Sequence, residues 1–533
     1  MRLRAWLGTT KGYQVRKRTR WGLITAVVAV AIGAPVSAAI PALAGTADGS
    51  DAIAVAPPAW TDCADGFQCA SIKAPLDYDH PRGRQVDLAM IKLPATNPAG
   101  RIGSLFVNFG GPGASGIERL RARAGWAWLF SPQLRERFDL VSWDTRGVGR
   151  STAVRCFDTQ QEQQDYFNAI PYFPVGADEE HSFYATAADL AQRCRRLNGD
   201  LLDHVSTANT ARDLNLMRRS VGDTQLSYLG ESYGTHVGAT YANLFPDKVR
   251  AMVLDGTLDF AGNANGHGVD GDRLPIDTRQ DVPRGIADTF DQFLARCTAA
   301  GTRCAFSAGD PRAKWAALTA AARQHPITVA GTTWTYAAIV GNVNDSLVRP
   351  EFWPDLASTL QAQYDARTGT APARVAAATH PTREKYLDNR SEAFFAINCV
   401  DSDVPHDTSV YSRLAVTEEQ RVPYFGPIGV FDYMPCAFWQ GHDRDRYVGP
   451  WNRRTAAPIL VTNNRYDPST PLKGAQDATN ELARAGLFVI DGAGHTGMYV
   501  HSTCGERVKR EYLFSAVLPG GGTTCAWDAD PFD

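Results

Sequence analysis

A serine flanked by two glycines stands between a strand-like and a helix-like stretch of this chain. Residues 226–242 read LSYLGESYGTHVGATYA, so an apolar strand pattern runs into Gly230-Glu-Ser-Tyr-Gly234 and then into a helical pattern. A sharp strand-to-helix turn needs small residues beside the serine and exposes its hydroxyl at the head of the sheet. The following helix N-terminus favours developing negative charge there. The pattern predicts Ser232 as a nucleophile, although an ordinary glycine turn before a helix would fit the same five letters.

Two later residues can supply the base and the acid that a serine nucleophile requires. Asp467 follows an apolar strand pattern at 458–462, and His495 follows another at 487–490. Hydrolases built on this elbow place the acid and then the histidine on loops after late strands. Order, strand context and spacing together predict a triad of Ser232, Asp467 and His495.

The assignment of acid and base leaves alternatives open. Asp255 and Asp259 come after the strand that follows the elbow, so either could be the acid. His501 could be the base; it lies six residues beyond His495, and we expect it in the last helix. Asp467-Pro468 could also simply begin a turn.

A glycine-rich loop precedes the elbow along the chain. Ser104–Phe109 is a compact apolar strand that leads directly into GGPGASG at 110–116. Glycines at this place let backbone N–H groups approach a ligand closely, which favours an oxyanion loop over an ordinary flexible loop. After the next strand, Asp144 and Arg146 are expected to form a structural pair that shapes the turn there.

The elements around these motifs alternate between strand and helix, the signature of a mostly parallel sheet covered on both faces. The alternation stops after Asp259 and returns near Pro458; the stretch between is helix-rich and carries four of the ten cysteines. We therefore expect an α/β core in two parts, residues 45–259 and 455–533. Residues 260–454 would form an inserted helical cap.

The N-terminal residues 1–44 have the pattern of an export signal. They contain seven Lys or Arg and no Asp or Glu, an apolar run at 21–34, and the small-residue sites Val36-Ser-Ala38 and Ala42-Leu-Ala44. An uncleaved anchor is the alternative, but the run is short for a membrane span. The formal net charge is -3, so the chain without this segment stands at -3 - 7 = -10. A mildly acidic body argues against nucleic acid as a partner, and no stable membrane association is expected after cleavage.

Ten cysteines fit an exported protein, because an oxidising compartment allows disulfides. Neighbours in sequence predict five bridges: Cys63–Cys69, Cys156–Cys194, Cys297–Cys304, Cys399–Cys436 and Cys504–Cys525. The chain has no C-x-x-C, so no zinc site is suggested. Serine chemistry of this kind calls for neither a metal nor a cofactor.

The motifs as a set resemble the secreted tripeptidyl aminopeptidase family of α/β-hydrolases, which is related to the prolyl aminopeptidases. The resemblance covers nearly all of the chain after the signal. It rests on Ala74–Tyr78, Asn108–Gly113, Asp144–Gly149, Gly230–Gly234, Asp467–Pro471, Gly494-His495 and the closing Cys504…Cys525 segment.

This resemblance implies the α/β-hydrolase fold and the triad given above. It also implies an oxyanion hole from backbone amides near Gly111 and at Tyr233. The chain departs from the family pattern at three places. Prolyl aminopeptidases have a histidine before the double glycine, where this chain has Asn108-Phe109. Thr145 stands where Pro or Gln is usual, and Thr496 stands where Gly is commoner. These departures leave the triad intact and put the lining of the pocket, and with it the substrate, in doubt.

The function expected is that of a secreted serine exopeptidase of the tripeptidyl type, acting on peptides through an acyl-enzyme. A free α-ammonium in a closed pocket needs a carboxylate partner, and Glu231, Asp401 and Asp403 are the candidates. Nothing in the triad separates amide from ester, so an esterase or lipase is the alternative; four cap aromatics, Phe394, Phe395, Phe438 and Trp439, would allow an apolar tunnel. The third hypothesis is a protein that keeps the hydrolase scaffold but only binds a ligand; the complete triad argues against it.

Overall fold

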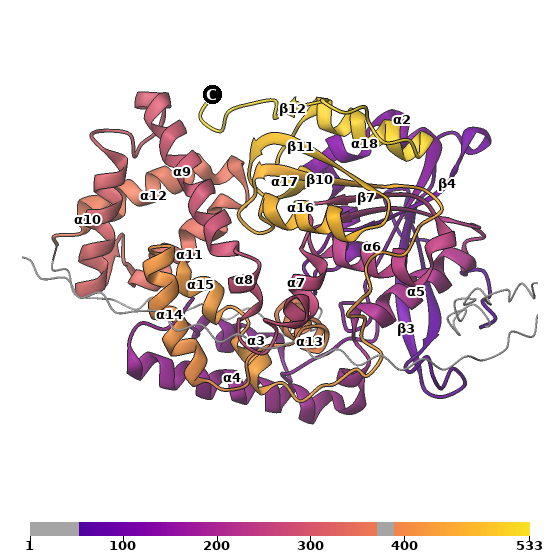
Figure 1. The fold of residues 1–533 in the computed structure, drawn as a ribbon, viewed down its shortest axis with the longest axis horizontal. Coiled ribbons are helices and arrows are strands. Elements are labelled where there is room, and N and C mark those ends of the chain that lie inside the picture. The colour runs from indigo at the N-terminus through magenta and orange to yellow at the C-terminus, as the bar shows by residue number, and fades with distance from the viewer. Residues whose placement is uncertain (1–52, 370–387) are drawn as a thin grey trace, which may run out of the picture. The chain divides into compact units, whose positions relative to one another are not determined.

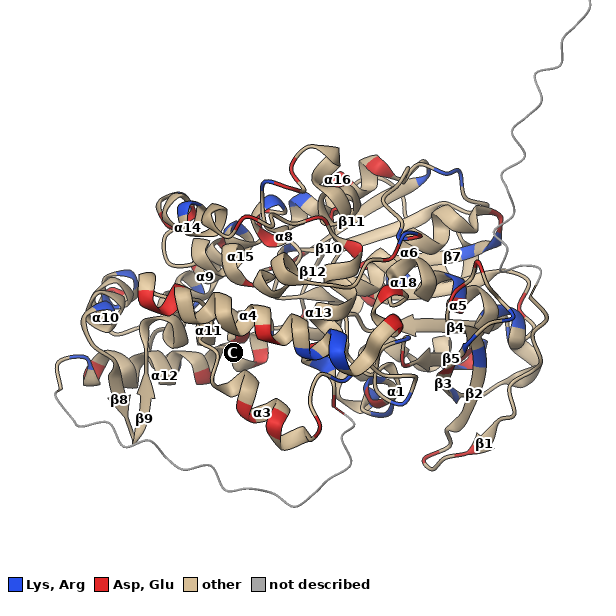
Figure 2. Ribbon diagram, turned by 90° about the horizontal axis from the view of Figure 1, so that it is seen from below, with Lys and Arg blue, Asp and Glu red and all other residues tan. Residues whose placement is uncertain are grey.

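The computed structural model describes residues 53–369 and 388–533 of the chain. The predicted signal segment, residues 1–44, lies outside the described residues. Within the described ranges, no helix combines the length and the apolar character needed to cross a membrane. Acidic and basic residues are interspersed over the described helices and strands in the view of Figure 2.

A ten-stranded sheet organises one part of the molecule (Figure 1). Its order is β1-β2-β3-β5-β4-β6-β7-β10-β11-β12, antiparallel from β1 to β5 and parallel from β5 onward. The strands are β1 Thr61–Asp62, β2 Gln68–Pro75, β3 Gln85–Leu93, β4 Gly103–Asn108, β5 Phe138–Trp143, β6 Leu226–Glu231, β7 Val249–Asp255, β10 Ile459–Tyr466, β11 Ala485–Ala493 and β12 Cys525–Ala526. The sheet is thus mostly parallel, as the alternation in the sequence predicts.

The central strands are buried on both faces, which explains their continuous apolar runs. Successive residues of β4 point to opposite faces. Phe106 packs with helices α5 (Thr207–Ser220) and α6 (Tyr233–Leu244), and Leu105 packs with α1 (Gly116–Arg121), α2 (Pro132–Arg137) and α18 (Thr503–Ser515). The helices that accompany the sheet are α1 Gly116–Arg121, α2 Pro132–Arg137, α3 Gln160–Asn168, α4 Ala177–Asn198, α5 Thr207–Ser220, α6 Tyr233–Leu244, α16 Leu472–Glu481, α17 Thr496–Tyr499 and α18 Thr503–Ser515.

The stretch between β7 and β10 is mainly helical, as expected. It contains α7 Phe260–Asn265, α8 Ile276–Arg279, α9 Val282–Ala300, α10 Pro311–Gln324, α11 Tyr336–Leu347, α12 Trp353–Ala366, α13 Arg390–Asp401, α14 Ser409–Arg421, α15 Gly426–Phe431 and the 3-10 helix η9 Met434–Phe438. A small hairpin, β8 Ile327–Val329 with β9 Thr332–Trp334, interrupts the helices. These helices enclose a second hydrophobic core, to which α4 also contributes. The boundaries of a separate cap domain remain a prediction.

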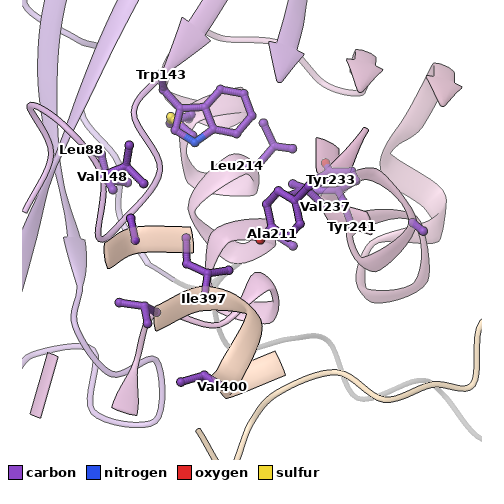
Figure 3. Packing of buried hydrophobic residues seen from close by; sticks show 14 of the residues in the cluster. Leu88, Trp143, Val148, Ala211, Leu214, Tyr233, Val237, Tyr241, Ile397 and Val400 are labelled. Atoms are coloured by element: carbon purple, nitrogen blue, oxygen red, sulfur yellow. The ribbon is translucent and has the colours of Figure 1, made fainter. Parts of the chain in front are cut away.

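One helix of this stretch packs with the helices beside the elbow. Figure 3 shows Ile397 and Val400 of α13 in the same buried cluster as Leu214 of α5 and Tyr233 of α6. Because Tyr233 directly follows the serine, α13 is packed against the segment that carries the nucleophile.

Each of the ten cysteines is paired, in the five bridges predicted from the sequence. Cys399 of α13 is joined to Cys436 of η9. This bridge ties the helix that packs beside the elbow to the segment that follows α15.

The expected pairing of Asp144 with Arg146 is wrong. Arg146 is fully buried and bonds to Asp213 of α5 through Nε (2.8 Å) and Nη2 (2.6 Å). Asp144 instead accepts hydrogen bonds from the Ser115 hydroxyl and from the backbone N–H groups of Ile117 and Arg150. Both residues are structural, but the partner of each comes from another part of the chain.

Candidate active site

Ser232 stands in a strained turn between β6 and α6. Its backbone has φ 56° and ψ -127°, a conformation that non-glycine residues rarely adopt and that costs of order 1–3 kcal/mol. The Ser232 N–H donates to the carbonyl of Asp255 on the neighbouring strand at 2.8 Å, which holds the turn against the sheet. This is the local geometry that the glycine-flanked motif predicts.

The glycines around Ser232 are required by space. A Cβ on Gly230 would lie 2.4 Å from the carbonyl oxygen of Gly234, and one on Gly234 would lie 2.5 Å from that of Asn108. A Cβ on Gly110, where φ is +76°, would lie 2.5 Å from the carbonyl oxygen of Glu231. The glycine loop after β4 therefore packs directly on the elbow, and no larger side chain fits at these three positions.

His495 and Asp467 meet at the ends of β11 and β10. His495 Nδ1 lies 2.9 Å and 3.0 Å from the two carboxylate oxygens of Asp467. The same carboxylate accepts backbone N–H bonds from Ser469 (2.9 Å), Thr470 (2.8 Å) and Thr496 (3.1 Å). These bonds fix the carboxylate, and contact with Nδ1 leaves Nε2 as the nitrogen that can serve a nucleophile.

The rival acids and the rival base are engaged elsewhere. Asp255 bonds to Lys509 Nζ at 2.7 Å, and Asp259 caps α7 through the N–H of Gly262 at 2.7 Å. His501 stacks on Trp128 with ring centroids 4.9 Å apart. It lies in the loop between α17 and α18, so its expected place in the last helix is wrong.

A cavity of about 300 Å³ brings the catalytic candidates together. Its lining includes Ser232 and His495 together with Gly111 and Tyr233, the predicted oxyanion-hole residues. Among the described groups, none accepts a hydrogen bond from the backbone N–H of Gly111 or Tyr233. These two donors can therefore serve an oxyanion formed next to Ser232.

Glu231 does not line this cavity. It is fully buried on β6, within the charged group formed by Asp255, Glu506 and Lys509. Burial and then the charge of Asp255 raise the pKa of Glu231 well above its usual range. Adjacency to Ser232 in sequence was misleading, because side chains of neighbouring strand residues point in opposite directions.

Asp401 and Asp403 also lie outside the cavity. Asp401 is buried and accepts hydrogen bonds from the N–H (2.9 Å) and hydroxyl (2.5 Å) of Thr207 at the start of α5; burial raises its pKa to about 7. Asp403 pairs with Arg446 at 2.5 Å and lines a separate pocket. Both carboxylates serve the attachment of α13 to its neighbours.

Two other carboxyl groups, Asp277 and Asp432, line the cavity with Ser232. They share a hydrogen bond, and burial followed by the charge of Asp432 holds the pKa of Asp277 well above its usual range. Burial raises the pKa of Asp432 to about 6. A hydrogen bond between two carboxyl groups requires a proton on one of them, and the larger upward shift of the Asp277 pKa favours Asp277 as the donor.

No pattern in the sequence predicts this carboxyl pair. Asp277 lies in the four-residue helix α8 and Asp432 directly follows α15, far apart along the chain. They meet because α8 and α15 pack together. No short motif surrounds either residue, so only the three-dimensional structure identifies them.

Two groups of side chains among the described residues could ligate a metal ion: Asp259 with His267 and Glu481, and Asp77 with Asp79 and Asp445. In the first, His267 Nε2 already lies 2.9 Å from Asp259. Neither group lines the cavity of Ser232.

Comparison with known proteins identifies the families and relatives that this chain resembles. Residues 422–525 match the family model described as TAP-like protein, and residues 105–302 match the one described as alpha/beta hydrolase fold. The chain is 31% identical to serine protease Hip1 of Mycobacterium tuberculosis over 86% of this chain and 87% of that protein. It is 29% identical to a tripeptidyl aminopeptidase of Streptomyces lividans, covering 87% and 84% of the two chains, and 30% identical to carboxylesterase B of Mycobacterium tuberculosis, covering 86% of each.

Proposed function

Because the chain belongs to the TAP-like family of α/β-hydrolases, we propose that it is a serine aminopeptidase that releases short peptides, of the tripeptidyl type, from free N-termini. The observation that carries the proposal is the carboxyl pair Asp277 and Asp432 in the same cavity as Ser232 and His495. An ammonium group loses its hydration in a closed cavity and needs a carboxylate to replace it. An ester without a free amine has no use for such a pair.

The proposed reaction begins when Ser232 attacks the scissile carbonyl. His495 takes the hydroxyl proton at Nε2, and Asp467 holds the imidazole by its Nδ1 side and stabilises the imidazolium. The N–H groups of Gly111 and Tyr233 receive the oxyanion. His495 then gives the proton to the leaving amine as the C–N bond breaks. In the second half His495 takes a proton from water, which attacks the acyl carbonyl, and returns that proton to Ser232 Oγ as the ester bond breaks.

In this proposal the carboxyl pair selects the substrate. Asp432 carries the charge that meets the α-ammonium, and protonated Asp277 holds the Asp432 carboxylate in place through the shared hydrogen bond. The distance from the carboxyl pair to Ser232 would fix how many residues are released. A blocked N-terminus would leave the Asp432 charge buried and unpaired.

An esterase is the second candidate, because one relative at 30% identity is named carboxylesterase B. Part of the cavity wall is apolar and aromatic, including Phe394, Ile428 and Tyr433. An acyl chain could occupy this wall without using the carboxyl pair.

We also propose that the protein acts outside the cytoplasm, in the extracellular space or the cell envelope. Five disulfides with no free thiol among ten cysteines are typical of an oxidising compartment. The basic and apolar N-terminal residues support export by sequence pattern.

The test is kcat/KM on a matched panel: a peptide amide with a free amine, its N-acetylated form and a simple acyl ester. Acetylation is expected to lower kcat/KM by about 30- to 5,000-fold, equivalent to about 2–5 kcal/mol of transition-state binding. Asp432→Asn should narrow this difference at least tenfold, whereas Asp403→Asn, outside the cavity, should leave it unchanged. Equal turnover of both peptides would overturn the aminopeptidase; high turnover of the ester alone would establish the esterase.

A further inference from the structure

A second, smaller cavity adjoins the carboxyl pair. It has a volume of about 170 Å³, and Asp432 lines both this cavity and the one that contains Ser232. Asp432 thus lies where the cavity of Ser232 adjoins a second cavity, to which the proposed reaction assigns no role.

The walls of this second cavity are aromatic and aliphatic. Phe167 and Phe395 stack with ring centroids 6.5 Å apart, and Phe183 and Phe431 meet edge to face at 5.8 Å. Ala187 of α4 also lines the cavity and is buried. The cavity opens where the sheet-side core meets the helical core, since its lining residues come from both.

The polar atoms of the other lining residues already have partners. The Tyr172 hydroxyl donates to Asp345 at 2.7 Å and accepts from Asn344 at 2.6 Å. The Thr186 hydroxyl donates to the carbonyl of Ser182 at 2.9 Å. Among the described residues that line this cavity, Asp432 is the one charged side chain. The cavity therefore suits a group that is apolar throughout, attached to a cation at the Asp432 end.

The first residue of a peptide has this chemistry. Its ammonium and its side chain leave the same Cα, so a carboxylate that binds the ammonium must adjoin the space that receives the side chain. We propose that the 170 Å³ cavity is the subsite for the side chain of the substrate's N-terminal residue, and that it selects a large aliphatic or aromatic side chain such as Leu or Phe. This inference rests on the proposed aminopeptidase function and names its substrate class.

The test uses the full-length protein and peptides that differ in the N-terminal residue alone: Leu, Phe, Ala or Asp before an unchanged sequence and scissile bond. Burial of a large apolar side chain predicts kcat/KM about 10- to 100-fold higher for Leu or Phe than for Ala. Asp should be poorest, because a second carboxylate would lie beside Asp432.

Filling the cavity should remove this preference. Ala187→Leu is expected to lower kcat/KM for the Leu and Phe peptides to within threefold of that for the Ala peptide. Ala187→Val, a smaller change in the same place, should have an intermediate effect if the Leu variant folds poorly. The matched control is Ala338→Leu, on α11 in the lining of the exposed recess of about 870 Å³ beyond Tyr172, which should keep the wild-type ranking.

The outcomes separate this inference from the function on which it rests. If free-amine peptides remain far better than acetylated ones but the four N-terminal residues react within threefold, the subsite is refuted and the aminopeptidase stands. If one further residue added before the first leaves kcat/KM unchanged, the cavity is a passage for the chain and the subsite is likewise refuted. If acetylation has no effect, the proposed function itself fails, whatever the side-chain ranking.

Discussion

The two sides of the cavity that contains Ser232 hold their carboxyl groups in opposite ways. On the sheet side, Asp467 is satisfied by three backbone N–H groups and by His495. On the helical side, Asp277 is the one described group that hydrogen-bonds to the Asp432 carboxylate. A carboxylate that orients a base works best when every partner is already in place. A carboxylate that recognises a cation needs oxygen lone pairs that are not already used in hydrogen bonds.

The largest effect is expected at the nucleophile. Ser232→Ala should lower kcat by 10⁵-fold or more, because no other group in the elbow can form the acyl-enzyme. A fluorophosphonate probe should label the wild-type protein once, and peptide mapping should locate the adduct at Ser232. Labelling of a different serine, or turnover within tenfold of wild type in the alanine variant, would show that Ser232 is not the nucleophile.

The next effect concerns Asp467. Asp467→Asn should leave folding intact and lower kcat about 10⁴-fold, because the amide favours the wrong imidazole tautomer of His495. Asp259→Asn is the control: the asparagine side-chain oxygen can still cap α7 through the N–H of Gly262, so stability should change little and kcat should be spared. Measuring kcat together with thermal unfolding distinguishes loss of catalysis from loss of stability in each variant. The opposite ranking of kcat would move the acid to Asp259.

The sheet side could be predicted from the sequence because its constraints are local. The turn at Ser232 has a strained backbone, and there is no room for a Cβ at Gly230 or Gly234. These requirements restrict the residue types within five consecutive positions, so they leave a recognisable motif. Asp467 and His495 follow strands whose apolar runs are readable, so fold order places them. The disulfides were predictable for the same reason, since each cysteine pairs with its neighbour in sequence.

The helical side could not be predicted, because its contacts are set by the packing of short helices. Asp277 and Asp432 belong to different helical segments, so their proximity in the fold produces no pattern in the sequence. Adjacency to Ser232 pointed instead to Glu231, and the expected cap pointed to Asp401; the structure places both in buried contacts away from the cavity. Likewise, Asp144 and Arg146 are two residues apart, but their actual partners come from other elements.

The charge on the helical side predicts a pH dependence that the sheet side does not share. The ratio of kcat/KM for a free-amine peptide to that for its acetylated form cancels the titration of the triad and reports amine recognition. Because the pKa of Asp432 is raised to about 6, Asp432 is ionised above that pH and protonated below it. The ratio should be high between about pH 6 and 8, and should fall about tenfold per unit below the Asp432 pKa. It should fall again as the peptide amine deprotonates, near pH 8.

Two variants sharpen this profile. Asp432→Asn should flatten the ratio across the acidic range, because the titrating charge is gone. Asp277→Asn should preserve most of the ratio at neutral pH, since an amide N–H can replace the proton that Asp277 donates. If Asp277→Asn abolishes the ratio and Asp432→Asn does not, the charge resides on Asp277 and the assignment within the pair is reversed.

The smallest expected effect tests whether the helical side needs its covalent anchor. Cys399–Cys436 joins α13 to η9, and Asp432 and Tyr433 lie directly before η9, where Tyr433 stacks on Phe394 of α13 at 5.3 Å. Replacing both cysteines by serine should lower stability by about 4 kcal/mol on chain entropy, against about 2 kcal/mol for Cys297–Cys304, which closes a shorter loop.

The same two double variants should differ in recognition as well as in stability. Loss of Cys399–Cys436 lets Asp432 move relative to Asn398 and Phe394, so the free-amine to acetylated ratio should fall a few-fold at temperatures where the protein remains folded. Loss of Cys297–Cys304, on α9 and the turn that follows it, should leave that ratio unchanged. Turnover of the acetylated peptide, which lacks the ammonium group proposed to bind Asp432, should change less than that of the free-amine peptide. A ratio that survives loss of Cys399–Cys436 would mean that noncovalent packing of α13, through Ile397 and Val400, is sufficient to position the carboxyl pair.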